Sequence, residues 1–214
     1  MEKQVIISIG RECGSGGCEI GKLLAEHYSI KLYDRNIISE LAKEYGANAG
    51  ELERIEEKVT GKMLPFARKN GFTAKIGGIG DKYTKSDRMF MMERAFITHL
   101  AETESFVIVG RAANALLEGR PNTLRLFIYA PESFKVPRVR EQYNLEDDQA
   151  AKKMMEKIDR ERREYFEYYS NMTWGAVDGH DFMLDSSIFG IEGTAKLIVE
   201  LADGKLGISA KEAA

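Results

Sequence analysis

A glycine-rich stretch near the N-terminus carries the residue types that bind phosphate. Residues 6–21 read IISIGRECGSGGCEIG, so an apolar, β-branched run stops at a glycine-rich loop and helical periodicity follows it. Glycines allow a backbone to approach an anion closely, and the N–H groups in the first turn of the next helix point toward that anion. The stretch therefore predicts a phosphate-binding loop. The residues expected to contact phosphate are Gly14, Ser15, Gly16, Gly17 and Cys18.

This loop departs at three positions from the usual signature, G-x-x-x-x-G-K-[ST]. When Gly16 is aligned with the second glycine, Arg11 stands where the first glycine belongs. Gly17 then replaces the lysine, and Cys18 replaces the hydroxyl that binds magnesium. The backbone shape is kept but the positive charge of the lysine is missing. We expect Arg11, together with arginines from a helix that closes over the loop, to supply that charge.

The composition indicates an ordinary globular protein with a local anion site. The chain has 214 residues, of which 43% are hydrophobic and 30% charged, which suits one domain with a sizeable core. A net charge of −3 gives no general attraction to nucleic acid or to a membrane, and no apolar run is long enough to span a bilayer. Because only two cysteines occur and no secretory leader precedes Val5, we expect a cytoplasmic protein.

Strand-like and helical patterns alternate along the chain, which predicts a parallel sheet with helices on both faces. In such a sheet, ligands gather at the carboxyl ends of the strands. The predicted strands are 4–9, 31–33, 106–109, 124–129 and 182–184, and the predicted helices begin near residues 17, 35, 86, 112, 131, 147 and 191, the last of them ending near 201.

Charged residues follow two of these strands and should face the glycine loop. Asp34 and Arg35 come directly after the second strand, and Arg111 follows Gly110 at the end of the third. A cation at the start of a helix is unfavourable for the helix dipole, so Arg111 is the strongest candidate for an anion contact. The alternative for Asp34 and Arg35 is a helix cap with a solvated arginine, and the alternative for Arg111 is a structural ion pair.

The helical pattern at 147–169 contains Arg160, Arg162 and Arg163. Arg160 and Arg163 share a face, whereas Arg162 lies closer to the apolar stripe. Guanidinium groups bind phosphate through two parallel hydrogen bonds, so these arginines suit a lid over a transferring phosphoryl group. The alternative is a solvated face on which Asp159 pairs with Arg163 four residues later.

The segment at about 46–85 is rich in glycine near its end and predicts an inserted lobe that closes over a substrate. A plain surface excursion is the alternative. The three histidines have no spacing typical of metal ligands, so no metal site is predicted.

The order and spacing of several motifs resemble the cytidylate-kinase-like proteins of bacteria, a branch of the nucleoside monophosphate kinases. These motifs are IISIGRECGSGG, IKLYDRNIISELA, FVIVGRAAN, LRLFIYAP, DRERREYFEYY and FMLDSS followed by GIE. The resemblance implies a single α/β domain over residues 1–214, a three-layer P-loop NTPase-like fold with a five-stranded parallel sheet. It also implies a helical lid at about 145–172 and a small inserted substrate lobe at about 46–85.

The resemblance also implies roles for individual residues. The glycine loop would hold the ATP phosphates, and the segment with Asp34 and Arg35 would begin the monophosphate side. Arg111 would contact the phosphate of the monophosphate, although Ala112 replaces the aspartate that follows this arginine in the family. Arg160 and Arg163 resemble the lid arginines. Asp185, in LDSS, would lie near the base or ribose of a nucleotide.

The expected function is an ATP- and Mg²⁺-dependent phosphoryl transfer to a nucleoside monophosphate, with CMP or dCMP as the expected acceptor. Catalysis would depend on Arg111, Arg160 and Arg163, and magnesium would be held mainly by phosphates and water. Two alternatives follow from the altered loop: a nucleotide-binding protein with weak or no kinase activity, and a kinase for another small acceptor. Small nucleotides are the expected partners, without nucleic acid or membrane, and no oligomeric state is predicted.

Overall fold

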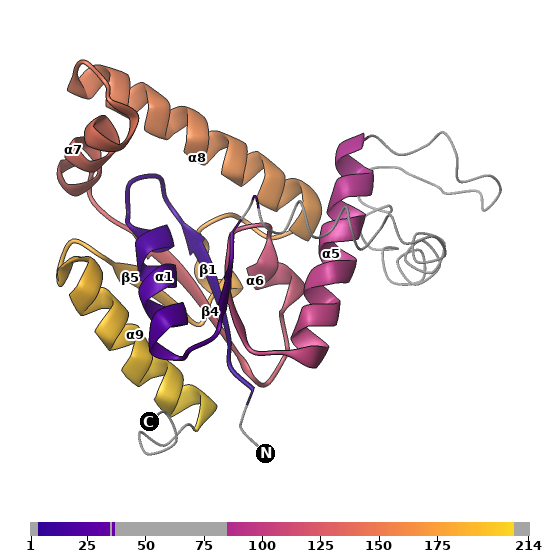
Figure 1. Ribbon diagram of the computed structural model, residues 1–214. Helices are drawn as coiled ribbons and strands as arrows, with labels where there is room; N and C mark the ends of the chain where they lie inside the picture. Colours follow the sequence, from indigo (N-terminus) through magenta and orange to yellow (C-terminus); the bar gives the residue numbers. More distant parts are fainter. Residues whose placement is uncertain (1–3, 35, 37–84, 208–214) are drawn as a thin grey trace.

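The computed structural model describes residues 4–34, 36 and 85–207, which form a parallel sheet with helices on both faces (Figure 1). The strands are β1 (Ile6–Arg11), β2 (Lys31–Tyr33), β3 (Phe106–Val109), β4 (Thr123–Tyr129) and β5 (Phe182–Asp185). The helices are α1 (Gly17–His27), α5 (Lys85–Thr103), α6 (Ala113–Leu116), α7 (Glu132–Tyr143), α8 (Asp148–Ser170) and α9 (Gly190–Leu206), with a 3₁₀ turn η1 (Val177–Gly179).

The strands lie in the order β2-β3-β1-β4-β5 and every pairing is parallel. The predicted five-stranded parallel sheet is therefore confirmed. β1 occupies the centre, because its apolar run can be buried on both faces. The glycine loop that follows β1 consequently opens at the middle of the carboxyl edge, where the ends of β3 and β4 flank it.

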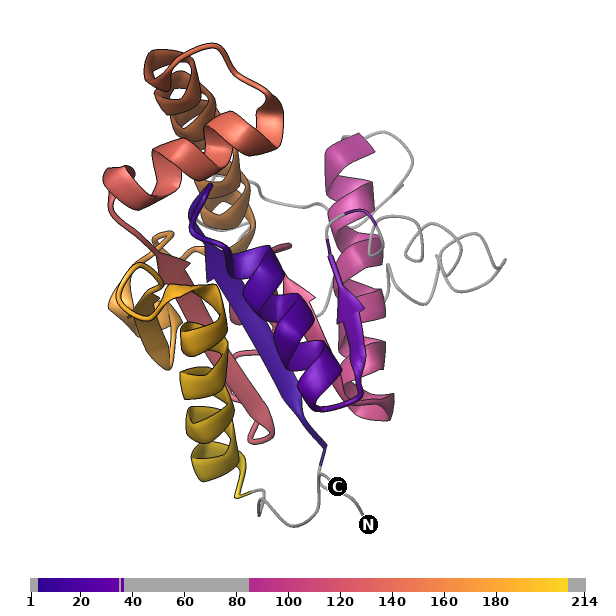
Figure 2. The ribbon, with the colours of Figure 1, turned by 60° about the vertical axis from the view of Figure 1, so that its left-hand side comes forward.

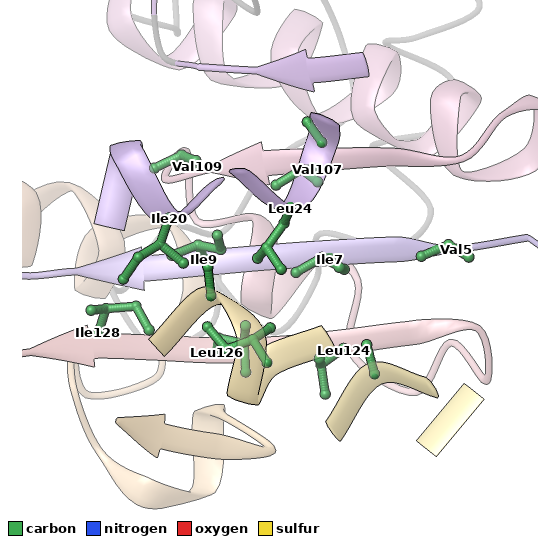
Figure 3. Close-up of a cluster of buried hydrophobic side chains, with 14 residues drawn as sticks. Val5, Ile7, Ile9, Ile20, Leu24, Val107, Val109, Leu124, Leu126 and Ile128 are labelled. Carbon is green, nitrogen blue, oxygen red and sulfur yellow. The ribbon is translucent and has the colours of Figure 1, made fainter. Parts of the chain in front are cut away.

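Alternate residues of the central strands pack on opposite faces of the sheet. One face packs against α1 and α9, and Figure 3 shows the side chains of that cluster. Its labelled members are Val5, Ile7, Ile9, Ile20, Leu24, Val107, Val109, Leu124, Leu126 and Ile128. The other face packs against α5 and α6 through Ile6, Phe106 and Ile108. Figure 2 shows α1 and α9 on one side of the sheet and α5 on the other.

The turn after β3 leads into a very short helix. A helix was expected from about Ala112, and α6 begins at Ala113 but contains only four residues. A left-handed turn of three residues precedes this helix. The φ values are 86° at Gly110, 57° at Arg111 and 52° at Ala112. α6 is therefore too short to cover β4 as well, and the segment that carries Trp174 packs against Phe127 on that face instead.

Two helices lie across the carboxyl edge of the sheet. Figures 1 and 2 show α7 and α8 on the side where β1 ends. Asp147 caps α8 by accepting a hydrogen bond from the Ala150 N–H at 2.7 Å. The two helices enclose a small apolar cluster that includes Cys13 of the glycine loop, together with Val139 and Met155. None of the helices in the described ranges is long and apolar enough to cross a membrane.

Candidate active site

The glycine loop joins β1 to α1 and takes the conformation its glycines allow. Gly14 and Gly16 have φ values of 79° and 80°, in the left-handed region that few other residues adopt readily. The Ser15 hydroxyl donates to the Glu12 carbonyl at 2.9 Å. The buried Ser186 hydroxyl, just beyond β5, donates to the Ser15 carbonyl at 2.6 Å. The loop is therefore held on both sides and opens toward α7 and α8.

Helix α7 brings two cations to the loop. Lys135 Nζ lies 2.6 Å from Glu12 Oε2, and Arg138 donates from Nε to the Gly14 carbonyl at 3.1 Å. Arg138 also binds both carboxylate oxygens of Glu19, at 2.6 and 2.7 Å. The sequence did not single out these two residues. The only signal was their spacing of three, which places both on one face of a helix.

Helix α8 contacts the loop through a carboxylate and a guanidinium. Asp159 Oδ1 accepts a hydrogen bond from the Cys13 N–H at 2.7 Å, and Arg162 donates to Asp159 at 3.1 Å and to the Arg11 carbonyl at 3.3 Å. The alternative that pairs Asp159 with Arg163 is wrong, because the carboxylate turns toward the loop and meets Arg162. Burial raises the pKa of Asp159, while Arg162 acts in the opposite direction.

A cavity of about 300 Å³ lies beneath α8, beside the carboxyl ends of β1 and β3. Three guanidinium groups line it, those of Arg11, Arg111 and Arg162. One carboxylate, that of Glu161, also lines it. Several aromatic side chains contribute to the remaining wall, namely Phe127, Tyr143, Tyr165, Phe166, Trp174 and His180. Cations at one place and flat apolar rings at another suit a ligand that carries both an anionic group and a planar ring.

Arg111 is fixed in this cavity by a buried cluster from three elements. Its Nη2 lies 3.2 Å from Glu93 Oε1, and the exposed fractions of these two side chains are 12% and 1%. The Tyr165 hydroxyl donates to Glu93 Oε2 at 2.7 Å, and the Arg111 guanidinium lies 5.3 Å from the centre of the Tyr165 ring. Burial, reinforced by Glu93, raises the pKa of Tyr165. The cluster joins α5, the end of β3 and α8.

Arg11 lies between two glycines at the end of β1. A side chain at Gly17 would approach Arg11 Cβ to 2.7 Å, and a side chain at Gly110 would collide with the Arg11 guanidinium. Arg11 Nε is buried and has no hydrogen-bond partner among the described residues. Burial lowers the pKa of Arg11 to about 10, and the charge of Arg162 acts in the same direction.

His180 closes the aromatic side of the cavity. Its Nδ1 lies 2.7 Å from the Ala176 carbonyl, so Nδ1 carries the proton in the neutral ring and Nε2 is an acceptor. The ring packs edge to face with Phe127, with centroids 5.1 Å apart. Burial lowers the pKa of His180, which keeps the imidazole neutral at pH 7.

The other residues predicted for the site lie elsewhere. Arg160 and Arg163 are exposed and line a second hollow, of about 360 Å³, between α7 and α8. Arg163 also stacks over the Trp174 ring, 5.4 Å from its centre. Asp185 accepts hydrogen bonds from the Ser187 N–H and hydroxyl, at 2.9 and 2.7 Å, and does not line the first cavity.

The monophosphate side of the predicted site is described only at its start. Asp34 accepts a hydrogen bond from the Asn36 N–H at 2.8 Å, as a helix cap would. Arg35 and the predicted lobe, apart from Lys85, lie outside the described residues. Within the described ranges, no group of three or more histidine, cysteine, aspartate or glutamate residues could hold a metal ion. Cys18, at the position of the magnesium-binding hydroxyl, is exposed, and a thiol is a poor ligand for a hard cation.

Comparison with known proteins agrees with this architecture. Residues 6–188 match the model of the cytidylate kinase-like family. A cytidylate kinase of Methanocaldococcus jannaschii is 25% identical over 93% of this chain and 98% of its own length. A cytidylate kinase of Methanopyrus kandleri is 24% identical over 93% of both chains. The crystal structure of an uncharacterized protein from Eubacterium ventriosum superposes with a TM-score of 0.70 and 29% identity, covering 94% of this chain and 99% of that one. Family and fold together support a phosphotransferase. The chain belongs to the cytidylate kinase-like family.

Proposed function

We propose that this protein transfers the γ-phosphoryl group of ATP to a nucleoside monophosphate, with CMP or dCMP as the expected acceptor. The observation that carries the proposal is the cavity beside the glycine loop, into which Arg11, Arg111 and Arg162 converge. A cavity of about 300 Å³ is at the lower end of the range for small-molecule sites. The names of the archaeal relatives support cytidylate as the acceptor.

The reaction requires positioning and charge neutralisation rather than a covalent intermediate. An oxygen of the acceptor's phosphate attacks the γ-phosphorus while the bridging oxygen to the β-phosphate leaves. The N–H groups from Gly14 to Cys18 would bind the donor phosphates. Arg111, held by Glu93 and Tyr165, would bind the acceptor's phosphate. Arg162 would neutralise the group in transfer.

Helix α8 is the proposed lid, and its other arginines are proposed to act on closure. Arg160 and Arg163 line the hollow that also contains Lys135 and Asp159, the two side chains of that hollow that contact the loop, at Glu12 and Cys13. A small rotation of α8 that withdraws Asp159 from the Cys13 N–H would turn Arg160 and Arg163 toward the donor phosphates. Asp34, Arg35 and Asp185 remain proposed contacts of the nucleotides.

Magnesium would be held chiefly by phosphate oxygens and water. In phosphotransferases this ion offsets the charge that develops on the phosphate chain. The chain contributes Cys18 where a hydroxyl is usual, so its own ligation of the ion is weak. Lys135 and Arg138 lie beside the loop, but they are paired with Glu12 and Glu19, so they would neutralise phosphate only after these ion pairs open.

A second candidate function is nucleotide binding with slow or no turnover. One observation favours it: Asp159 places a negative charge on the Cys13 N–H, directly before the loop amides proposed to bind phosphate. Nucleotide must displace this carboxylate before it can occupy the loop fully. Asp159→Asn should therefore raise the affinity for ATP by about tenfold, because it removes a like charge at contact distance.

An ADP-release assay with ATP and Mg²⁺ tests the two candidates. The acceptors to compare are CMP, dCMP, UMP, AMP and GMP, followed by small non-nucleotide alcohols and acids, and calorimetry measures the binding of ATP and CMP alongside. Release of ADP that depends on CMP or dCMP supports the kinase. Binding of both nucleotides without acceptor-dependent ADP release supports the second candidate. Turnover with only a non-nucleotide acceptor would contradict both.

A further inference from the structure

The residue at the lysine position of the loop is a glycine for a steric reason. Gly17 begins α1 and does not have a positive φ, so its conformation admits any residue. A Cβ at this position would nevertheless lie 2.7 Å from Arg11 Cβ and 3.0 Å from Arg11 Cγ. Arg11 Cβ is fixed by the backbone of β1 and cannot move away, and Cγ could move only through a change of χ1. The first atoms of the Arg11 side chain therefore occupy the room that a side chain at Gly17 would need.

The charge that the lysine would carry is present at Arg11. The Arg11 guanidinium lies over Gly110, interacts with the Cys18 thiol and lines the same cavity as Arg111 and Arg162. Its Nε is buried without a partner among the described residues. The charge of Arg162 opposes that of Arg11, and Asp159 offsets this repulsion only in part, so an anion bound in the cavity would stabilise both guanidinium groups. The pKa of Arg11, about 10, leaves it charged at neutral pH.

We propose that Arg11 is the phosphate-binding cation of this loop. In this proposal the cation and the glycine of the usual signature have exchanged places: Arg11 stands at the position of the first glycine, and Gly17 stands at the position of the lysine. Two of the three departures from the usual signature, those at Arg11 and Gly17, are then one change. The positive charge moves from the end of the loop to its beginning, and the glycine moves the other way. Because the two side chains compete for one space, only one of the two cations can be accommodated.

This inference rests on the proposed function for the identity of the anion, which is the phosphate chain of a nucleoside triphosphate. Its test is independent of turnover. Isothermal titration calorimetry with inorganic tripolyphosphate and with ATP and Mg²⁺ measures anion binding directly. The proteins to compare are the wild type, Arg11→Met, Arg11→Gly, Gly17→Lys and the double variant Arg11→Gly with Gly17→Lys.

Arg11→Met keeps the volume of the side chain and removes its charge. It should lower the affinity for tripolyphosphate roughly 10- to 100-fold, as expected for the loss of a charged hydrogen-bonding group, with little change in melting temperature. Arg120→Met is the matched control. Arg120 donates to the Ala101 carbonyl at 3.2 Å, away from the loop, so this variant should keep the wild-type affinity.

The four-protein cycle tests the exchange itself. Arg11→Gly should bind tripolyphosphate weakly, and Gly17→Lys should both melt at a lower temperature and bind weakly, because its Cβ collides with Arg11. The double variant should recover an affinity within a few-fold of the wild type. Wild-type affinity in Arg11→Met, or a wild type that binds neither anion, would overturn the inference. So would a folded double variant that binds no better than either single variant.

Failure of the proposed function gives a different result. If ATP binds through Arg11 but no monophosphate is phosphorylated, the inference stands and the kinase does not. If CMP is phosphorylated equally well by wild type and Arg11→Met, the kinase stands and the inference is wrong.

Discussion

Removal of one partner of the ion pair between Glu93 and Arg111 should be strongly destabilising, since it takes the opposite charge away from a side chain that lies inside the protein. Their exposed fractions are 1% and 12%, and the Tyr165 hydroxyl completes the cluster. Glu93→Gln keeps the shape of the side chain and removes the negative charge that faces the guanidinium. Removal of one partner of a buried pair typically costs 3–5 kcal/mol. Because Arg111 keeps some solvent access through the cavity, we expect the lower end, about 3 kcal/mol.

The measurement is thermal and urea unfolding followed by circular dichroism. For a domain of this size, about 3 kcal/mol corresponds to a fall in melting temperature of roughly 6–12 °C. Tyr165→Phe should cost about 1.5–3 kcal/mol, the value for a hydrogen bond to a charged group. The double variant should lose less than the sum of the two single losses, because both substitutions remove contacts to the same carboxylate.

An exposed ion pair provides the control. Lys22 lies 4.0 Å from Glu26 on α1, and the exposed fractions of the two side chains are 73% and 61%. Lys22→Ala should change the unfolding free energy by less than about 0.5 kcal/mol. A loss below about 1 kcal/mol in Glu93→Gln, or strictly additive losses in the double variant, would refute the view that this cluster is a coupled buried network.

Three further predictions concern the loop and the cavity. Cys18→Ser supplies the missing hydroxyl ligand, so the ADP-release assay should show a kcat at least about tenfold higher, whereas Cys18→Ala should give no gain. Gly14→Ala strains a residue with φ of 79° that packs against α7, and should lower the unfolding free energy by about 1–3 kcal/mol. Gly204→Ala, on an open face of α9, should not lower it. Because the pKa of His180 is lowered in the folded protein, the unfolded chain takes up a proton at a higher pH than the folded one. The unfolding free energy should therefore keep its full value above about pH 6.5 and decrease below it. Urea titrations at several pH values should show that His180→Phe removes this decrease.

The sheet could be predicted from the sequence because burial on both faces leaves a simple pattern. β1, β3 and β4 are short, nearly continuous apolar runs, and each was placed within one or two residues of its observed bounds. The extent of α6 could not be predicted. Arginine and alanine rarely adopt positive φ, and here Arg111 and Ala112 do so in a turn where Arg111 contacts Glu93 and Tyr165, residues distant in the sequence.

The site could be predicted where topology alone decides it. The loop after β1 and Arg111 after β3 meet because parallel strands bring their carboxyl ends to one edge. The orientation of α8 could not be obtained this way. Arg162 stands between Ile158 and Tyr165 at helical spacing, within the apolar stripe, and this position was a signal that it turns inward. Lys135 and Arg138 depend on how α7 docks more than 100 residues after the loop.

The close approach of Arg11 to Gly17 and Gly110 has a consequence for the evolution of the family. Two positions of the glycine loop and a third about 100 residues later share one space, so they should vary together among relatives. Sequences with lysine at the position of Gly17 should carry a glycine or another small residue at the position of Arg11. In these sequences no guanidinium would exclude a side chain at position 110, although the positive φ there still favours glycine. Intermediates with both cations, or with neither, should be rare, because a single substitution at either loop position leaves the phosphate site crowded or uncharged.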